Sequence, residues 1–168
     1  LANLGPLQAD ATIAEFTIKE RPIDIVEALL THDAEIVGFG VYIWNLTATT
    51  QVVTLLKRLR PNLTVVLGGP EVSYEWDEQP IVEAADYLIR GEGDLAFRRL
   101  CEAILNDNAP TTRVFDGGAP ELSEIVLPYT LYTDEDIANR VLYVEASRGC
   151  PFRCEFCLSA LEKGVRQF

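Results

Sequence analysis

Three of the four cysteines, Cys150, Cys154 and Cys157, lie close together near the end of the chain, in the sequence RGCPFRCEFC. Their spacing is C-x3-C-x2-C. A cubic iron–sulfur cluster uses soft thiolate ligands on neighbouring irons, and three cysteines leave one iron without a protein ligand. Such an open iron can bind a substrate. The pattern therefore predicts a 4Fe-4S cluster on this loop, with Phe152 and Phe156 shielding it from water.

Three other uses of the cysteines compete with the cluster. A structural zinc site needs four nitrogen or sulfur ligands, but Cys101 falls inside a predicted helix and His32 lies far upstream. A disulfide framework is typical of small secreted domains. Thioredoxin-like chemistry uses a C-x2-C pair and leaves the third cysteine without a role. The iron–sulfur interpretation is favoured because it uses all three neighbouring thiols.

RGCPFRCEFC resembles the signature of the radical S-adenosylmethionine superfamily, C-x3-C-x-aromatic-C, with Phe156 as the aromatic residue. The resemblance implies that the three cysteines hold a 4Fe-4S cluster and that S-adenosylmethionine chelates the fourth iron. An electron donor then reduces the cluster, and cleavage of a C–S bond gives a 5′-deoxyadenosyl radical. The resemblance also implies that the strand VLYVEAS is the first of a (β/α) barrel.

The first 107 residues alternate strand-like and helix-like runs. This alternation predicts a doubly wound, flavodoxin-like parallel sheet with helices on both faces, an α/β fold. The expected strands cover 11–18, 35–42, 63–69 and 85–90, and the expected helices cover 22–30, 47–61 and 92–107.

The later part of the chain has a different composition. Residues 108–139 are rich in Pro, Gly and Thr and are interpreted as a connector with one short strand around Val114. A new strand over 140–147 opens a second, truncated domain at 140–168. The chain starts at Leu1 and contains no methionine, so we expect it to be an N-terminal piece of a longer protein.

Ligands of a doubly wound sheet bind outside the carboxyl ends of its strands. Segments 41–45, 68–76 and 91–94 leave predicted strands at that edge. The paired glycines Gly68 and Gly69 allow a bulky ligand to approach the backbone, and nearby aromatic rings offer flat faces. An alternative of equal weight is that these glycines and Pro70 only turn the chain.

Residues 1–107 resemble the cobalamin-binding domain that precedes the barrel in one large class of radical S-adenosylmethionine enzymes. The similarity is carried by VGFGVYIWN, VVLGGPEVS and YLIRGEGD, and it implies cobalamin as a further cofactor. His32, the sole histidine, precedes its strand and is expected at the opposite edge, so no protein ligand to cobalt is assigned. The candidate cofactor-binding residues are Tyr42, Ile43, Trp44, Asn45, Gly68, Gly69, Pro70, Gly91, Glu92 and, at the cluster, Phe156.

GEGDLA also fits G-x-G-x-x-A, a dinucleotide-binding pattern, through Gly91, Gly93 and Ala96. Two carboxylates, Glu92 and Asp94, would repel a pyrophosphate there. Helix capping by these acids is therefore favoured over dinucleotide binding. Cys101 is interpreted as a core thiol.

A net charge of −12 opposes binding to nucleic acid or to an anionic membrane. No apolar run is long enough to span a membrane and no secretory signal is present, so we expect a cytoplasmic protein. The favoured function is that of an enzyme using cobalamin and S-adenosylmethionine for methyl transfer or radical rearrangement on a small-molecule or unknown substrate. Its catalytic residues are not assigned. The alternative is a docking module that shapes the barrel entrance and binds no cobalamin.

Overall fold

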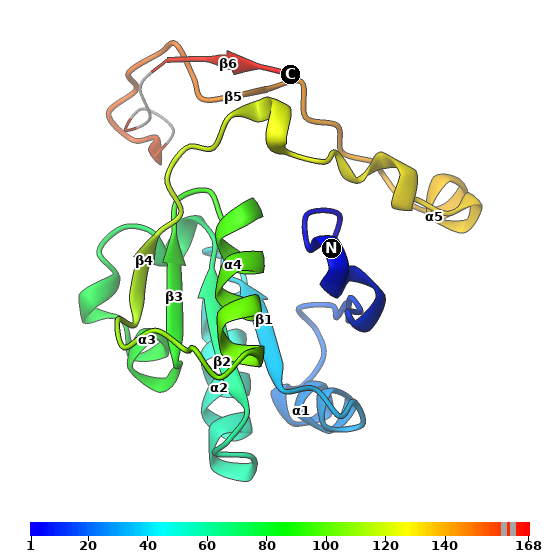
Figure 1. Cartoon of the computed structure of the whole chain (residues 1–168), viewed down its shortest axis with the longest axis vertical. Helices are drawn as coiled ribbons and strands as arrows, with labels where there is room; N and C mark the ends of the chain where they lie inside the picture. Colours follow the sequence, from blue (N-terminus) through cyan, green and yellow to red (C-terminus); the bar gives the residue numbers. More distant parts are fainter. Residues whose placement is uncertain (159–160, 162–163) are drawn as a thin grey trace.

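A four-stranded parallel sheet forms the centre of the protein (Figure 1). The structure is a computed structural model and describes residues 1–158, 161 and 164–168. The strands pair in the order of the chain: β1 (Ile36–Gly40), β2 (Thr64–Gly68), β3 (Tyr87–Arg90) and β4 (Val114–Asp116). The register places Gly40 opposite Gly68, so β1 and β2 end at the same level. Their carboxyl ends therefore form a common edge.

Helices cover both faces of this sheet, as the alternating pattern predicts. The helices are α1 (Pro22–Leu30), α2 (Leu46–Leu59), α3 (Pro80–Ala84) and α4 (Asp94–Leu105). Val53 of α2 and Ile81 of α3 pack in one buried cluster with Leu67 of β2. On the other face, Leu100 of α4 packs with Val66. Alternate residues of β2 thus enter two different cores, which explains why this strand is apolar throughout.

Two predicted strands are wrong. Residues 11–18 form no strand, and Ile13 and Ile18 are exposed. The segment 140–147 is irregular except at its last residue, and the Tyr143 side chain is 81% exposed. Both segments have the β-branched and aromatic composition of strands. Among the described residues, segment 11–18 pairs with no strand, and segment 140–147 pairs only through Ser147, with Gln167. Strand propensity alone does not stabilise an unpaired strand.

The remaining elements are short. β5 (Ser147–Arg148) and β6 (Arg166–Gln167) form an antiparallel pair, which lies above the carboxyl ends of the sheet in Figure 1. α5 (Asp134–Asn139) was not predicted and begins with a capping box between Thr133 and Asp136. The predicted short strand around Val114 is confirmed as β4. The 3-10 turns are η1 (Gly5–Asp10), η2 (Pro70–Val72), η3 (Trp76–Glu78), η4 (Leu122–Glu124) and η5 (Pro128–Leu131).

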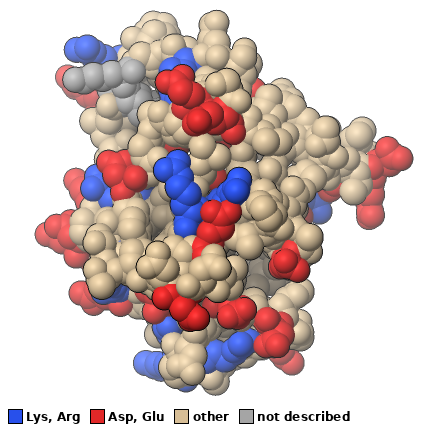
Figure 2. Space-filling view, viewed as in Figure 1, with Lys and Arg blue, Asp and Glu red and all other residues tan. Residues whose placement is uncertain are grey.

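Acidic side chains are spread over the face of the molecule drawn in Figure 2, and the basic side chains occur beside them in small groups. This distribution agrees with the net charge of −12. Among the residues that the structure describes, no helix is both long enough and apolar enough to cross a membrane.

Candidate cofactor site at the carboxyl edge

The loop after β1 presents an exposed aromatic surface at the carboxyl edge. The rings of Tyr42 and Trp44 are stacked, with centroids 4.6 Å apart and planes at 11°. The Trp44 side chain is 65% exposed, and Ile43 beside it is also exposed. Asn45 folds the loop: its Oδ1 accepts from the backbone N–H of Tyr42 at 2.8 Å and its Nδ2 donates to the carbonyl of Gly40 at 3.0 Å. Asn45 therefore supports the loop, while the rings face solvent.

The two glycines after β2 have different roles. Gly69 has φ +110°, and a Cβ there would lie 2.5 Å from the carbonyl oxygen of Val41. The protein's own backbone therefore requires this glycine, which favours the turn interpretation at this position. A Cβ on Gly68 would meet only the Ile89 carbonyl oxygen, at 3.6 Å. A methyl group would thus fit at Gly68, whereas Gly69 is packed against Val41, the residue after β1.

Ser73 connects the loops after β2 and β3. This buried residue donates its hydroxyl to the carbonyl of Gly69 at 2.8 Å and accepts from the N–H of Gly91 at 3.0 Å. Arg90 donates to the Ser73 carbonyl at 2.9 Å, and its guanidinium lies 6.0 Å from the centre of the Trp76 ring. Neither Ser73 nor Arg90 was selected from the sequence. The only available signal was a serine four residues after a glycine, a spacing that permits a side-chain bond to the backbone.

A further glycine pair reaches the same edge from β4. Gly117 donates its N–H to the Arg90 carbonyl at 2.8 Å, and Gly118 donates to Asp116 Oδ1 at 2.9 Å. A Cβ on Gly118 would have no neighbour within 4 Å. These glycines fall in the segment 108–139 that was predicted to be a connector. They continue the open surface that begins at Gly68, so we call Gly40, Gly68, Gly91 and Gly118 the glycine floor.

Glu92 and Asp94 follow β3 and bind arginines from the end of the chain. Arg148 Nη1 donates to Glu92 Oε2 at 2.6 Å and to Asp94 Oδ2 at 2.7 Å. Arg166 forms an ion pair with the other oxygen of Glu92. The prediction that these acids cap helix α4 by hydrogen bonds is wrong. The N-cap residue of α4 is Gly93, and no side chain caps it. The carboxylates are occupied by distant cations instead.

This pairing changes the acidity of Asp94. The hydrogen bond from Arg148 holds the pKa of Asp94 below its ordinary value, although burial acts in the opposite direction. The same bond raises the pKa of Arg148, which stays charged throughout the accessible pH range.

The lowered pKa of Asp94 predicts that its contribution to stability depends on pH. Asp94→Asn is expected to lower the free energy of unfolding by about 1–2 kcal/mol at neutral pH, because it removes a charged hydrogen bond. The folded-state pKa lies below the 3.8 of a free aspartate, so the stabilisation is present above pH 3.8 and is lost as the pH falls toward the folded pKa. Urea unfolding of both proteins at pH 7 and near pH 3 should show the difference shrinking. A difference that stays constant with pH would contradict the assigned charge pair.

The three clustered cysteines are free thiols on a loop that begins where β5 ends. Cys150 is half-buried, and Cys154 and Cys157 are exposed. Within the described residues, no three potential ligands gather closely enough to hold a metal ion. The donor set suits iron–sulfur chemistry, but binding requires the loop to close around the cluster. Phe156 is 94% exposed and shields nothing in this conformation.

Cys101 stands apart from this loop. It is buried in α4, and burial raises its pKa to about 11. The thiol is therefore neutral at physiological pH, as expected for the core residue predicted from the sequence. His32 lies between α1 and β1, before its strand, at the amino edge. It is remote from the proposed cofactor edge, as the sequence predicts.

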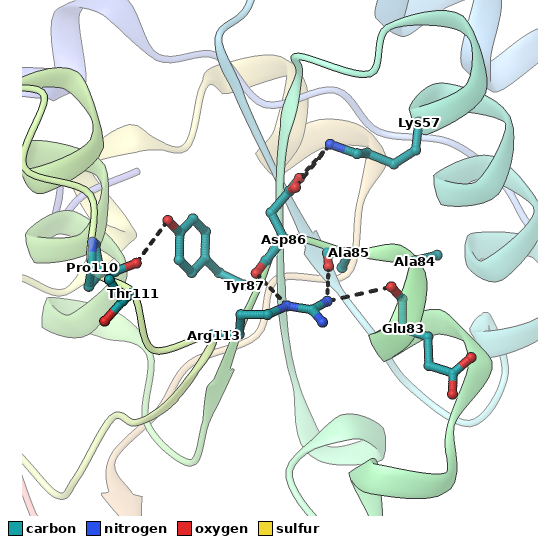
Figure 3. Close-up of a pocket in the computed structure, with 9 residues that line it drawn as sticks. All are labelled: Lys57, Glu83, Ala84, Ala85, Asp86, Tyr87, Pro110, Thr111 and Arg113. Carbon is teal, nitrogen blue, oxygen red and sulfur yellow. Dashed lines mark hydrogen bonds and ion pairs between the residues drawn. The ribbon is translucent and has the colours of Figure 1, made fainter.

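A cavity of about 510 Å³ opens at the amino edge of the sheet (Figure 3). Three of its charged residues, Lys57, Asp86 and Arg113, bind one another or the backbone. Lys57 donates to Asp86 Oδ2 at 2.8 Å, and the same oxygen accepts from the N–H of Val65 at 2.8 Å. Arg113 donates to carbonyl groups at the end of α3. These contacts hold α2 and the end of α3 against the sheet. The charged residues that make them at this cavity therefore have a structural role.

Comparison with known proteins shows the family of the chain through residues 6–101. The family model described as "B12 binding domain" matches residues 6–101. An uncharacterized methyltransferase of Pyrococcus horikoshii is 30% identical over 85% of this chain and 35% of its own length. The cobalamin-dependent radical SAM methyltransferase TokK of Streptomyces tokunonensis is 30% identical over 74% of this chain and 22% of its own length.

A third relative carries a different name. The anaerobic magnesium-protoporphyrin IX monomethyl ester cyclase of Synechocystis is 27% identical over 80% of this chain and 31% of its own length. The chain thus spans between about a fifth and about a third of the length of these curated relatives.

Proposed function

Because this chain belongs to the B12 binding domain family and is similar to a cobalamin-dependent radical SAM methyltransferase, we propose that it binds cobalamin at the carboxyl edge of the sheet and is part of a radical S-adenosylmethionine protein. The proposed contacts are the β1 loop, Tyr42 to Asn45, and the loops that start at Gly68 and Gly91. We further propose that Cys150, Cys154 and Cys157 hold a 4Fe-4S cluster to which S-adenosylmethionine binds, with Phe156 beside it.

The observation that carries the cobalamin proposal is the exposed pair of stacked rings beside the glycines at this edge. The stacked rings of Tyr42 and Trp44 stand beside the glycine floor, where Cβ atoms on Gly68 and Gly118 would make no close contact. A large planar ligand can lie on such a surface, with its ring system against backbone and aromatic faces. At the amino edge, by contrast, Lys57, Asp86 and Arg113 beside the cavity are engaged in ion pairs and backbone hydrogen bonds.

The residues of the chain have separate tasks in this proposal. Trp44 and Tyr42 bind the ligand by apolar contact, and the glycine floor lets it approach the backbone. Pro70 and Ser73 hold the loop after β2 in place. Cobalamin and S-adenosylmethionine, when bound, supply methyl-carrying and radical-generating chemistry, which the protein orients.

For the whole protein we propose methyl transfer to an unreactive carbon of a small-molecule substrate. The names of two methyltransferase relatives support this reaction, and the cyclase relative supports radical rearrangement as the second candidate. The proposal includes an electron donor for the cluster and a cytoplasmic location. It includes no nucleic acid or membrane partner, which the charge of −12 supports.

A binding experiment with Trp44→Ala tests the proposed site. Hydroxocobalamin is titrated into the purified chain, and binding is followed by the absorbance spectrum and by co-elution in gel filtration. Loss of one aromatic face should weaken binding by about tenfold. The matched control is Tyr143→Ala, which removes another exposed ring, distant in sequence from the β1 loop. This control should bind like the parent.

Equal cobalamin affinity in the parent, Trp44→Ala and Tyr143→Ala would show that cobalamin does not contact the β1 loop. Absence of any binding by the parent chain would favour the alternative in which this domain docks against the barrel without a cobalamin.

A further inference from the structure

Arg148 lies between the two parts of the chain that carry the proposed cofactor sites. It forms β5 with Ser147 and is followed, two residues later, by Cys150. Its partners Glu92 and Asp94 immediately follow Gly91, at the end of β3. The Arg148 side chain therefore attaches the start of the cysteine loop to the edge where cobalamin is proposed to bind.

All three guanidinium nitrogens of Arg148 are engaged. Nε and Nη2 donate to Glu145 at 3.0 Å each, and Nη2 also donates to Asp94 at 3.1 Å, in addition to the two bonds made by Nη1. The Phe168 ring covers the guanidinium at 5.6 Å. Only 14% of the side chain is exposed. A cation this enclosed is costly to leave without its carboxylates, so its position is strongly specified.

Apolar packing does little to hold the neighbouring segment. Tyr143 and Val144, a few residues before Arg148, are almost fully exposed, and so are most side chains of the cysteine loop that the structure describes. Arg166 adds a second polar attachment through Glu92 and through the Pro120 carbonyl, at 2.7 Å. Among the described residues, the ion pairs of Arg148 and Arg166 are thus the principal side-chain contacts between this part of the chain and the α/β domain.

We propose that Glu92 and Asp94 are positioning residues: together with Arg148 and Arg166 they form a latch that fixes the cysteine loop against the carboxyl edge of the sheet. The latch sets where the three thiols stand relative to the glycine floor. The pair of acids in GEGD is thereby explained without a dinucleotide or a helix cap. Only the purpose given to the latch rests on the proposed function, since the contacts themselves need no cofactor.

Thiol alkylation of the metal-free, cobalamin-free chain tests the latch. The rate at each cysteine is measured with iodoacetamide and peptide mass spectrometry in the parent, Arg148→Gln and Asp94→Asn. Because Cys150 is half-buried next to the latch, its rate should rise by about tenfold when a charged bond is lost. Cys154 and Cys157 are already exposed and should change little. Buried Cys101 should remain protected, which reports that the α/β domain is folded.

Two comparisons make the result specific. Arg148→Gln and Asp94→Asn should not add when combined, because both break the same contact. Arg98→Gln removes a partly buried pair with Glu102 within α4 and should leave the Cys150 rate unchanged. An unchanged Cys150 rate in both latch variants would overturn the proposal. Equal acceleration of alkylation at all cysteines, including Cys101, would also overturn the proposal. It would mean that the Arg148–Asp94 pair stabilises the whole domain and does not position the cysteine loop. Neither outcome bears on cobalamin binding.

Discussion

Gly69→Val is expected to destabilise the α/β domain by roughly 3 kcal/mol and to abolish cobalamin binding with it. A valine at φ +110° is strained, and its Cβ would lie 2.5 Å from the Val41 carbonyl oxygen and 2.8 Å from the Val41 nitrogen. The backbone of the β1 loop would have to move, and with it the stacked rings. For a chain of this size the melting temperature should fall by roughly 10 °C. Thermal unfolding followed by circular dichroism measures the loss.

Gly68→Ala is the matched control for this prediction. The adjacent glycine has room for a methyl group, since the nearest atom would be 3.6 Å away. Its stability should stay within about 1 kcal/mol of the parent. Any weakening of cobalamin binding in Gly68→Ala then reports contact with the glycine floor, separate from folding. Equal stability of the Gly69 variant and the parent would contradict the close packing of Gly69 against β1.

Cys154→Ala is expected to abolish assembly of the iron–sulfur cluster. After anaerobic reconstitution with iron and sulfide, the parent should contain about four irons per chain, and the variant less than about one. The physical reason is that three thiolates are the only protein ligands in the proposed site. Iron analysis and the visible absorption spectrum give the measurement.

The control for cluster assembly is Cys101→Ala. This thiol is buried in α4, so its loss should reduce stability through a small cavity and leave the iron content unchanged. Cobalamin affinity should be the same in Cys154→Ala and the parent, because the proposed contacts belong to the loops at the sheet edge. A full complement of iron in Cys154→Ala would reject the proposed ligand set.

The sheet could be predicted from the sequence because its strands are distinctive. β1, β2 and β3 all fall inside apolar runs bounded by turn residues, and α1 begins at the predicted Pro22. The segments 11–18 and 140–147 have similar composition, but among the described residues only Ser147, at the end of the second segment, pairs with another strand. Pairing between strands is a tertiary property, and composition does not reveal it.

Only the features of the site that depend on neighbouring residues in the sequence could be predicted. The rule that ligands bind at the carboxyl edge places the loops after β1, β2 and β3 together, and the structure does so. The contacts of Glu92 could not be predicted, because Arg148 lies 56 residues further along the chain. The same applies to Ser73 and Gly91, which meet across 18 residues. Long-range polar contacts decide the use of these residues, and local spacing gives no sign of them.

The position of Ser73 has a consequence for affinity. One hydroxyl binds the loop after β2 and the loop after β3 at the same time, and the Val41 N–H binds the Gly68 carbonyl at 2.7 Å, which joins the loop after β1 to them. The three loops are thus ordered before any ligand arrives. A ligand that binds to a preorganised surface loses little conformational entropy of the protein, so most of its contact energy appears as affinity.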